Sequence, residues 1–170
     1  MKKKIKLLLA IFLFIVIGFL GYKISSKLIH KKEVAERIKV IPNFSFYTLD
    51  GNEFSDKNLQ KKPSVFVYFN SECNYCQSEA KKIQERLLDF KGVQLIFISY
   101  EEKEAIQQFA KEYQLANQEN VLFLEDRKGE FSKLFDVNSI PFMVIYDEDK
   151  KLLQKFKGAT KVDKILEVLE

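Results

Sequence analysis

The sequence predicts an α/β domain built on a mixed β-sheet and preceded by one membrane-spanning helix. Apolar strand patterns alternate with amphipathic helix patterns from residue 41 onward, and 46% of the chain is apolar, enough for a core. Upstream, Leu7 to Tyr22 is a run of sixteen apolar or glycine residues behind a lysine cluster. We therefore divide the chain into a membrane anchor or uncleaved signal over 1–24, a charged stalk over 25–40 and a domain over 41–170.

The charge of the chain is unevenly distributed. Residues 1–40 carry ten lysines and arginines against two glutamates, a net charge of +8, which leaves −4 on the remaining 130 residues. A nucleic-acid-binding domain would need a basic patch on its folded part, so this distribution argues against nucleic acid as a partner. A membrane surface accounts for the basic segment better.

The apolar run has the properties of an anchor. As a helix it spans roughly 24 Å, somewhat less than the ~30 Å hydrocarbon core of a bilayer, and flanking lysines can extend to the interface. A cleaved signal peptide needs small residues at −3 and −1, but cuts after Gly21 or Ser26 place Phe19 or Ile24 at −3. We expect an uncleaved anchor, with a cleaved peptide and a buried core helix as alternatives. Lysines flank both ends similarly, so charge does not orient it.

Strand and helix patterns alternate through the domain. Apolar runs of strand length predict central strands at residues 64–69, 93–99 and 121–124. Helical periodicity predicts helices around residues 80–90, 101–115, 131–135 and 160–169. The last of these helices begins with a predicted capping box of Thr160 and Asp163.

Hairpins flank this centre. Asp50-Gly51 is a strong hairpin dipeptide, and a second turn is expected at residues 147–149. The paired strands are 44–48 with 53–54 and 142–146 with 152–156. Parallel strands with crossover helices, closed by an antiparallel hairpin and a last helix, imply a mixed sheet.

Cys73 and Cys76 follow the first buried strand, where the first helix of the domain begins. Unpaired amides and the positive end of the helix dipole stabilise a thiolate there. This spacing lets the two thiols form a small disulfide, and one thiol can attack a substrate disulfide while the other resolves the mixed disulfide. A cysteine pair at such a junction is typical of redox proteins.

Two structural interpretations of the pair compete with the redox one. A structural zinc site needs about four ligands, whereas the chain has two cysteines and one histidine, His30, which lies in the stalk. A static disulfide would close a very short loop and constrain little of the unfolded chain. We expect no metal, and we expect redox work from the pair.

A series of motifs runs in order along residues 41–170. They are Ile41 to Phe46, Asp50-Gly51, Pro63 to Phe69, Cys73 to Cys76 with Glu79, Ser139 to Phe142 and Asp147 to Lys151. Together they resemble the TlpA/ResA-like thioredoxin family, bacterial membrane-anchored or exported proteins of the AhpC/TSA-like superfamily. The resemblance implies a thioredoxin-like fold with an added N-terminal β-hairpin.

The resemblance assigns supporting roles around the cysteines. Pro141 matches the cis-proline that faces the disulfide, and a neighbouring backbone group would pair with substrate. Ile140 before it is the residue that thioredoxins use. Glu79 matches an acidic residue proposed to tune the thiols. An ordinary strand-entry proline and a solvated helix-surface glutamate are the alternatives for Pro141 and Glu79.

Three positions depart from the family pattern. Glu72 replaces the usual tryptophan before the first cysteine, and its carboxylate opposes thiolate formation at Cys73 by like-charge repulsion. Val67 occupies the position of the buried aspartate of thioredoxins, so a proton acceptor is missing unless Glu79 supplies it. Tyr75 stands between the cysteines, where it either contacts substrate or is simply exposed.

The expected protein is a membrane-tethered thiol-disulfide oxidoreductase with a redox-active Cys73–Cys76 disulfide and no cofactor. By the resemblance, it reduces disulfides of cell-envelope proteins and takes electrons from a membrane or soluble donor. Its domain lies on the extracytoplasmic side of the cell membrane, behind a single-pass helix.

Two other functions stay open. A thiol peroxidase of the peroxiredoxin type would have proline seven and threonine or serine three residues before its nucleophile, where this chain has Phe66 and Asn70. A non-catalytic redox-sensing or partner-binding module would have a disulfide too stable for ordinary dithiols to reduce, which a measured reduction potential would reveal.

Overall fold

The computed structural model describes the backbone of residues 2–170 and the side chains of residues 12–170. The chain divides into two compact units, Met1–Glu36 and Arg37–Glu170. Helix α1 (Lys2–Arg37) makes up the first unit. Within the described residues it is the one helix long and apolar enough to cross a membrane. The predicted lysine flank and the start of the apolar run, residues 2–11, lie outside the described side chains.

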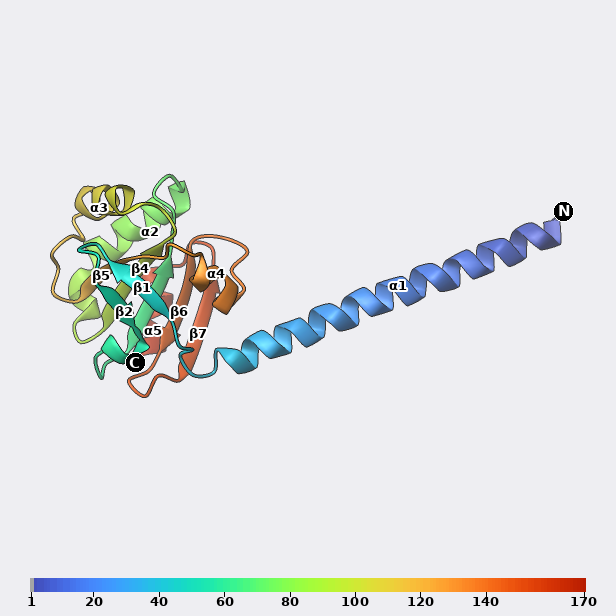
Figure 1. The fold of residues 1–170 in the computed structure, drawn as a ribbon, viewed down its shortest axis with the longest axis horizontal. Coiled ribbons are helices and arrows are strands. Elements are labelled where there is room, and N and C mark those ends of the chain that lie inside the picture. The colour runs from blue at the N-terminus through green and yellow to red at the C-terminus, as the bar shows by residue number, and fades with distance from the viewer. Residues whose placement is uncertain (1) are drawn as a thin grey trace. The chain divides into compact units, whose positions relative to one another are not determined.

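The second unit is built on a mixed sheet, seven-stranded in the described part of the chain (Figure 1). Its order is β2-β1-β5-β4-β3-β6-β7, with β3, β4 and β5 parallel and all other neighbours antiparallel. The strands are β1 (Ser45–Thr48), β2 (Glu53–Ser55), β3 (Ser64–Tyr68), β4 (Gln94–Ser99), β5 (Val121–Glu125), β6 (Phe142–Tyr146) and β7 (Leu152–Lys157).

Three helices cover one face of this sheet. Their apolar residues form one core cluster with Val65 and Val67 of β3 and with Phe69, the residue that follows β3. Helices α2 and α3 follow successive parallel strands, and right-handed crossovers place both on the same face, where Figure 1 shows them adjacent. The three helices are α2 (Asn74–Glu85), α3 (Lys103–Glu112) and α5 (Val162–Leu169).

The other face carries an aromatic cluster under the short helix α4 (Glu130–Phe135). Because side chains alternate along a strand, Phe66 and Tyr68 point away from the α2 side. Phe131 of α4 stacks on Tyr68 with ring centroids 4.9 Å apart and contacts Phe66 at 6.4 Å and Phe46 at 6.3 Å. Phe131 is fully buried, so it is the centre of this second core layer.

Residues 37–41 are integrated into the second unit. The Arg37 guanidinium donates hydrogen bonds of 3.0 Å to the carbonyls of Lys133 and Leu134, at the end of α4. The Tyr146 hydroxyl donates to the carbonyl of the fully buried Ile38 at 2.9 Å. The compact unit therefore includes residues that the sequence predicts as stalk.

The structure confirms the predicted fold class and both hairpins, and it corrects the helix ends. The helix expected to reach Phe90 ends at Glu85 and is followed by a 3-10 turn over Leu87–Phe90. The helix expected over 101–115 ends at Glu112, since Gln114 takes a left-handed φ of 54°.

The predicted capping box at the last helix is wrong. In the described chain the residue that precedes α5 is Lys161, which makes no capping hydrogen bond through its side chain. The Thr160 hydroxyl donates instead to the Gly158 carbonyl at 3.2 Å. The Thr160 amide donates to a glutamate on α2, a contact between distant segments that local sequence does not reveal.

Truncation of Phe131 should destabilise the domain. We expect Phe131→Ala to lower the free energy of unfolding by about 3–5 kcal/mol, because it leaves a cavity among packed aromatic rings. Leu88→Ala is the control, since Leu88 is 76% exposed and its truncation should cost less than about 0.5 kcal/mol. Urea unfolding of the full chain in detergent measures both, and equal losses would contradict the assignment of Phe131 to the core.

Candidate active site

The two cysteines lie at the junction between β3 and α2. Cys73 is the N-cap of α2, with extended backbone angles, and Cys76 lies in its first turn. The Cys76 amide donates a hydrogen bond to the Cys73 sulfur at 3.4 Å. Both thiols are free, Cys73 half-buried and Cys76 only 2% exposed. The helix start thus directs an amide at the more accessible sulfur, as the sequence predicts.

The surroundings of Cys76 disfavour its thiolate. Burial is the largest cause that raises the pKa of the Cys76 thiol, and contact with Cys73 and the charge of Glu79 raise it further. The backbone of Asn70 opposes the shift through a hydrogen bond. Cys76 is therefore a thiol that needs a proton acceptor before it can act as a nucleophile.

Glu79 lies buried, one helical turn beyond Cys76. Its side chain is 2% exposed, which rules out the solvated-surface interpretation. One carboxyl oxygen, Oε1, accepts a hydrogen bond from the Thr160 amide at 2.9 Å, whereas Oε2 has no hydrogen-bond partner among the described residues. Burial raises the pKa of Glu79 to about 7, and the Thr160 amide and Lys82 limit the rise. The carboxyl can therefore gain and lose a proton near neutral pH.

The loop before β6 reaches the same edge of the sheet. Tyr68 pairs with Phe142, so Pro141 lies beside the end of β3, where the cysteine loop begins. The Ile140–Pro141 peptide bond is cis, as the resemblance implies, and the Pro141 carbonyl accepts from the Gly158 amide at 2.8 Å. Ile140 and Cys73 both pack, half-buried, against the core cluster on the α2 side. The fold thus brings the cis-proline loop to the cysteine edge.

A hollow of about 570 Å³ lies next to this loop. Its walls combine the aromatic side chains Tyr68 and Tyr100 with Ile140 and residues of the α4 segment. Tyr100 is exposed, so the hollow is open to solvent along one side. An extended polypeptide could lie here beside the cis-proline.

Glu101, which follows β4, is a residue of this site that was not predicted from the sequence. Its carboxylate accepts hydrogen bonds from the Ser71 amide at 2.7 Å, the Ser71 hydroxyl at 2.6 Å and the Ser99 hydroxyl at 2.9 Å. Ser71 precedes Cys73 by two residues, so Glu101 contacts the cysteine loop directly. A polar residue just after a buried parallel strand was the available signal, because β3 and β4 end at the same edge of the sheet.

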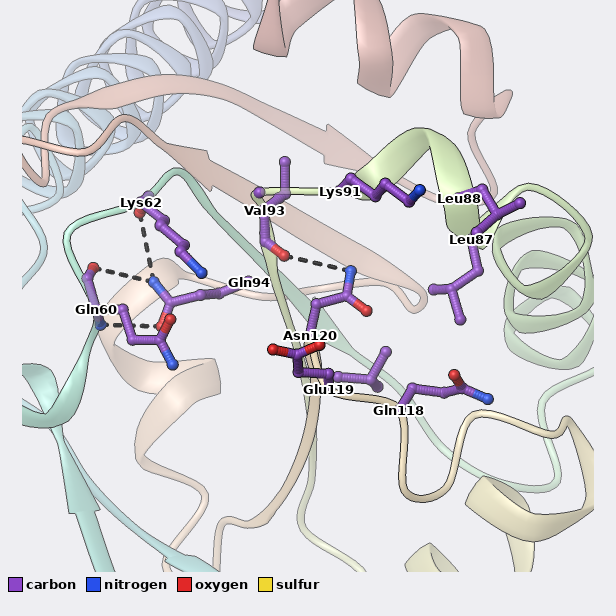
Figure 2. A pocket seen from close by; sticks show the side chains of 12 residues that line it. Gln60, Lys62, Leu87, Leu88, Lys91, Val93, Gln94, Gln118, Glu119 and Asn120 are labelled. Carbon is purple, nitrogen blue, oxygen red and sulfur yellow. Dashed lines mark hydrogen bonds between the residues drawn. The ribbon is translucent and has the colours of Figure 1, made fainter.

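A second hollow, of about 340 Å³, lies at the opposite end of the sheet (Figure 2). It surrounds Gln94, the first residue of β4, whereas the cysteines follow the last residue of the parallel β3. Figure 2 shows the Gln94 amide bonded to the backbone of Gln60 and Lys62, and the Asn120 amide bonded to Val93. These amide groups are already hydrogen-bonded to neighbouring segments of the chain, and the hollow is remote from the thiols.

Of the remaining residues singled out by sequence, one is buried in the sheet, two are exposed and one lies in the first unit. Val67 is buried in β3, and Glu72 and Tyr75 are exposed, Tyr75 to 69%. His30 lies on α1, in the first unit. Among the described residues, no group of three or more histidine, cysteine, aspartate or glutamate side chains could hold a metal ion.

Known proteins match most of this chain. The AhpC/TSA family model matches residues 39–162. The thiol-disulfide oxidoreductase ResA of Bacillus thuringiensis subsp. konkukian is 28% identical over 173 aligned residues, covering 100% of this chain and 98% of the relative.

Solved structures share the fold. A secreted Mycobacterium tuberculosis disulfide oxidoreductase, homologous to Escherichia coli DsbE, is 25% identical with a TM-score of 0.64, covering 79% of this chain and 96% of its own. The peroxidoxin BcpB of M. tuberculosis, 18% identical with a TM-score of 0.65, covers 76% of this chain and 93% of its own, and shares the fold alone. The chain thus belongs to the AhpC/TSA family and is a thiol-disulfide oxidoreductase with a thioredoxin-like fold.

Proposed function

We propose that this oxidoreductase is tethered to the membrane by α1 and reduces disulfides of cell-envelope proteins through Cys73 and Cys76. The observation that carries the proposal is the unequal exposure of the pair at a helix N-terminus. Cys73 is half-buried and receives an amide hydrogen bond, whereas Cys76 lies buried behind it. This arrangement supports Cys73 as the attacking thiol and Cys76 as the resolving thiol.

The reaction would proceed in two exchanges. The Cys73 thiolate attacks one sulfur of the substrate disulfide, and the other substrate sulfur leaves as a thiolate that takes up a proton. Cys76 then loses its proton and attacks the Cys73 sulfur, which releases the second substrate thiol and forms the Cys73–Cys76 disulfide. Two electrons pass to the substrate, and a membrane or soluble dithiol donor restores the pair.

Glu79 is proposed as the acceptor of the Cys76 proton. It is buried on the same helix, its charge raises the pKa of Cys76, and its Oε2 has no hydrogen-bond partner among the described residues. Since the pKa of Glu79 itself is about 7, the carboxyl can accept a proton in the second exchange and release it afterwards. Glu79 would thus replace the aspartate of thioredoxins, whose position is taken by Val67.

The substrate would enter beside the cis-proline loop. The hollow bordered by Tyr100 and Ile140 can receive the polypeptide around the substrate disulfide. The backbone of Ile140 makes no hydrogen bond with other backbone groups of the described residues, so it is able to pair with an extended segment. Tyr75, exposed between the cysteines, is a further contact for substrate.

The tether and the side of the membrane are also part of the proposal. The length and apolar composition of α1 support a single-pass anchor. An extracytoplasmic domain fits the presence of only two cysteines, both in one motif, because stray thiols are hazards in an oxidising compartment.

Loss of Cys73 should abolish disulfide reduction. We expect the full chain in detergent, supplied with a dithiol donor, to reduce insulin disulfides, and Cys73→Ser to fall to the uncatalysed rate. Cys76→Ser is the matched variant, because it keeps the first exchange but stops at the mixed disulfide. Activity of Cys73→Ser equal to the parent protein would refute the proposal, as would rapid consumption of peroxide without insulin reduction.

Trapping should identify both the substrates and the side of the membrane. With Cys76→Ser, the mixed disulfide on Cys73 cannot be resolved, so substrates accumulate covalently attached to the protein. We expect mass spectrometry of non-reducing eluates from cells to find envelope proteins, and the Cys73→Ser, Cys76→Ser double variant to capture none. Capture of cytosolic proteins alone would contradict an extracytoplasmic domain.

Replacement of Glu79 should change how stability depends on pH. Because the pKa of Glu79 rises from 4.5 to about 7 on folding, the folded protein binds more protons between these values, and its unfolding free energy falls as pH rises through them. Glu79→Gln should remove up to ~3 kcal/mol of this loss at pH 8. Urea unfolding between pH 4 and 8 measures it, with the exposed Glu85→Gln as control. If the unfolding free energy of Glu79→Gln fell with pH as much as that of the parent protein, Glu79 would not be the group with the raised pKa.

A further inference from the structure

The Glu101 carboxylate connects two neighbouring strand ends at the cysteine edge. Ser99 is the last residue of β4, and its hydroxyl donates to Oε2 at 2.9 Å. The other two hydrogen bonds of the carboxylate, at 2.7 and 2.6 Å, come from the amide and hydroxyl of Ser71. Most of the bonding capacity of Glu101 is thus directed at the loop before Cys73.

The same loop residue is held from the other side by α2. The Gln77 side-chain amide donates to the Ser71 carbonyl at 2.7 Å, one turn into the helix. Ser71 is therefore fixed at its amide and hydroxyl by Glu101 and at its carbonyl by Gln77. The adjacent Asn70 carbonyl accepts from the Cys73 amide at 3.2 Å. Ser71 is consequently tied both to Glu101, which follows β4, and to α2, while Asn70 is bonded to the N-cap of α2.

We propose that Glu101 is a positioning residue for thiol-disulfide exchange, which holds the loop so that the Cys73 sulfur stays over the free amides of the α2 N-terminus. The inference rests on the proposed function of Cys73 as the attacking thiol. It assigns Glu101 no contact with substrate or with sulfur. Its effect is exerted through Ser71, two residues upstream of the nucleophile.

A positioning role and a charge effect of Glu101 predict opposite changes in the reactivity of Cys73, so the two effects can be separated. A carboxylate near a thiolate disfavours it, and removing that charge alone would make Cys73 more reactive. Loss of the loop anchor moves the sulfur away from the helix amides and makes Cys73 less reactive. The sign of the change in reactivity therefore identifies which effect dominates.

The test measures alkylation of Cys73 by iodoacetamide between pH 5 and 9, in the full chain with Cys76→Ser, in detergent. We expect Glu101→Ala to lower the rate at pH 7 by about threefold to tenfold and to move the midpoint of the pH–rate profile upward. Glu101→Gln, which keeps one acceptor oxygen, should fall between Glu101→Ala and the parent. Glu102→Ala is the control, because Glu102 is exposed and loses the same charge one residue away.

Ser71→Ala provides a milder variant that removes only the hydroxyl contact. We expect it to lower the alkylation rate less than Glu101→Ala and to add nothing further in the double variant, since both changes delete the same bond. In the chain with both cysteines, the reduction potential of the Cys73–Cys76 disulfide should become more negative in Glu101→Ala. The shift is about 30 mV for each tenfold change in the equilibrium constant of its reduction. A folding defect alone would not move the pH midpoint in this pattern.

Three results would overturn the proposal: a faster rate in Glu101→Ala, an unchanged rate, or an equal fall in Glu102→Ala. Each leaves the proposed function intact, because insulin reduction by the parent and its loss in Cys73→Ser are measured separately. If Cys73→Ser retained insulin reduction, the proposed function itself would fail whatever Glu101 does.

Discussion

The placement of Cys73 at the start of α2 is the constraint on which the rest of the active edge depends. A helix start offers unpaired amides, but only within its first turn, so a sulfur placed beyond that turn would lose them. The Cys76 amide reaches the Cys73 sulfur because Cys73 is the N-cap itself. The strand that delivers it, β3, is central in the sheet and buried at every position, which fixes where the helix can begin.

The two faces of the sheet contribute different parts of the active site. On the α2 side, aliphatic residues and phenylalanines from the sheet and three helices form the core around Cys76. Glu79 is the one buried carboxylate on α2. On the α4 side, aromatic rings packed around Phe131 hold α4 in place, and the chain continues from α4 to the cis-proline loop. Two loops from opposite layers thereby meet at one edge, and the packing of each layer determines how precisely they meet.

Much of this arrangement follows from the sequence, because its signals are local. Apolar runs of strand length, Asp50-Gly51 and the cysteine spacing predict the strands, a hairpin and the helix start without knowledge of distant contacts. The features that were predicted wrongly, or not predicted, depend on tertiary contacts. Thr160 looks like a cap in sequence, but its amide is bound by Glu79, 81 residues away. Glu101 gives no periodic signal, and its partner Ser71 is 30 residues distant.

Glu79 lies between these cases. Its spacing from Cys76 places it on the same helix face, but spacing does not show whether that face is buried. The answer depends on the loop between β7 and α5, which covers it and supplies one amide for two carboxyl oxygens.

The burial of Cys76 also bears on how the protein withstands oxidants. Only Cys73 is accessible to a small oxidant such as hydrogen peroxide, which would convert its thiolate to a sulfenic acid. The neighbouring Cys76 thiol can condense with that sulfenic acid, releasing water and forming the Cys73–Cys76 disulfide. Oxidative injury at this edge thus ends in the state that a dithiol donor already reduces, before the sulfur reaches an irreversible oxidation level.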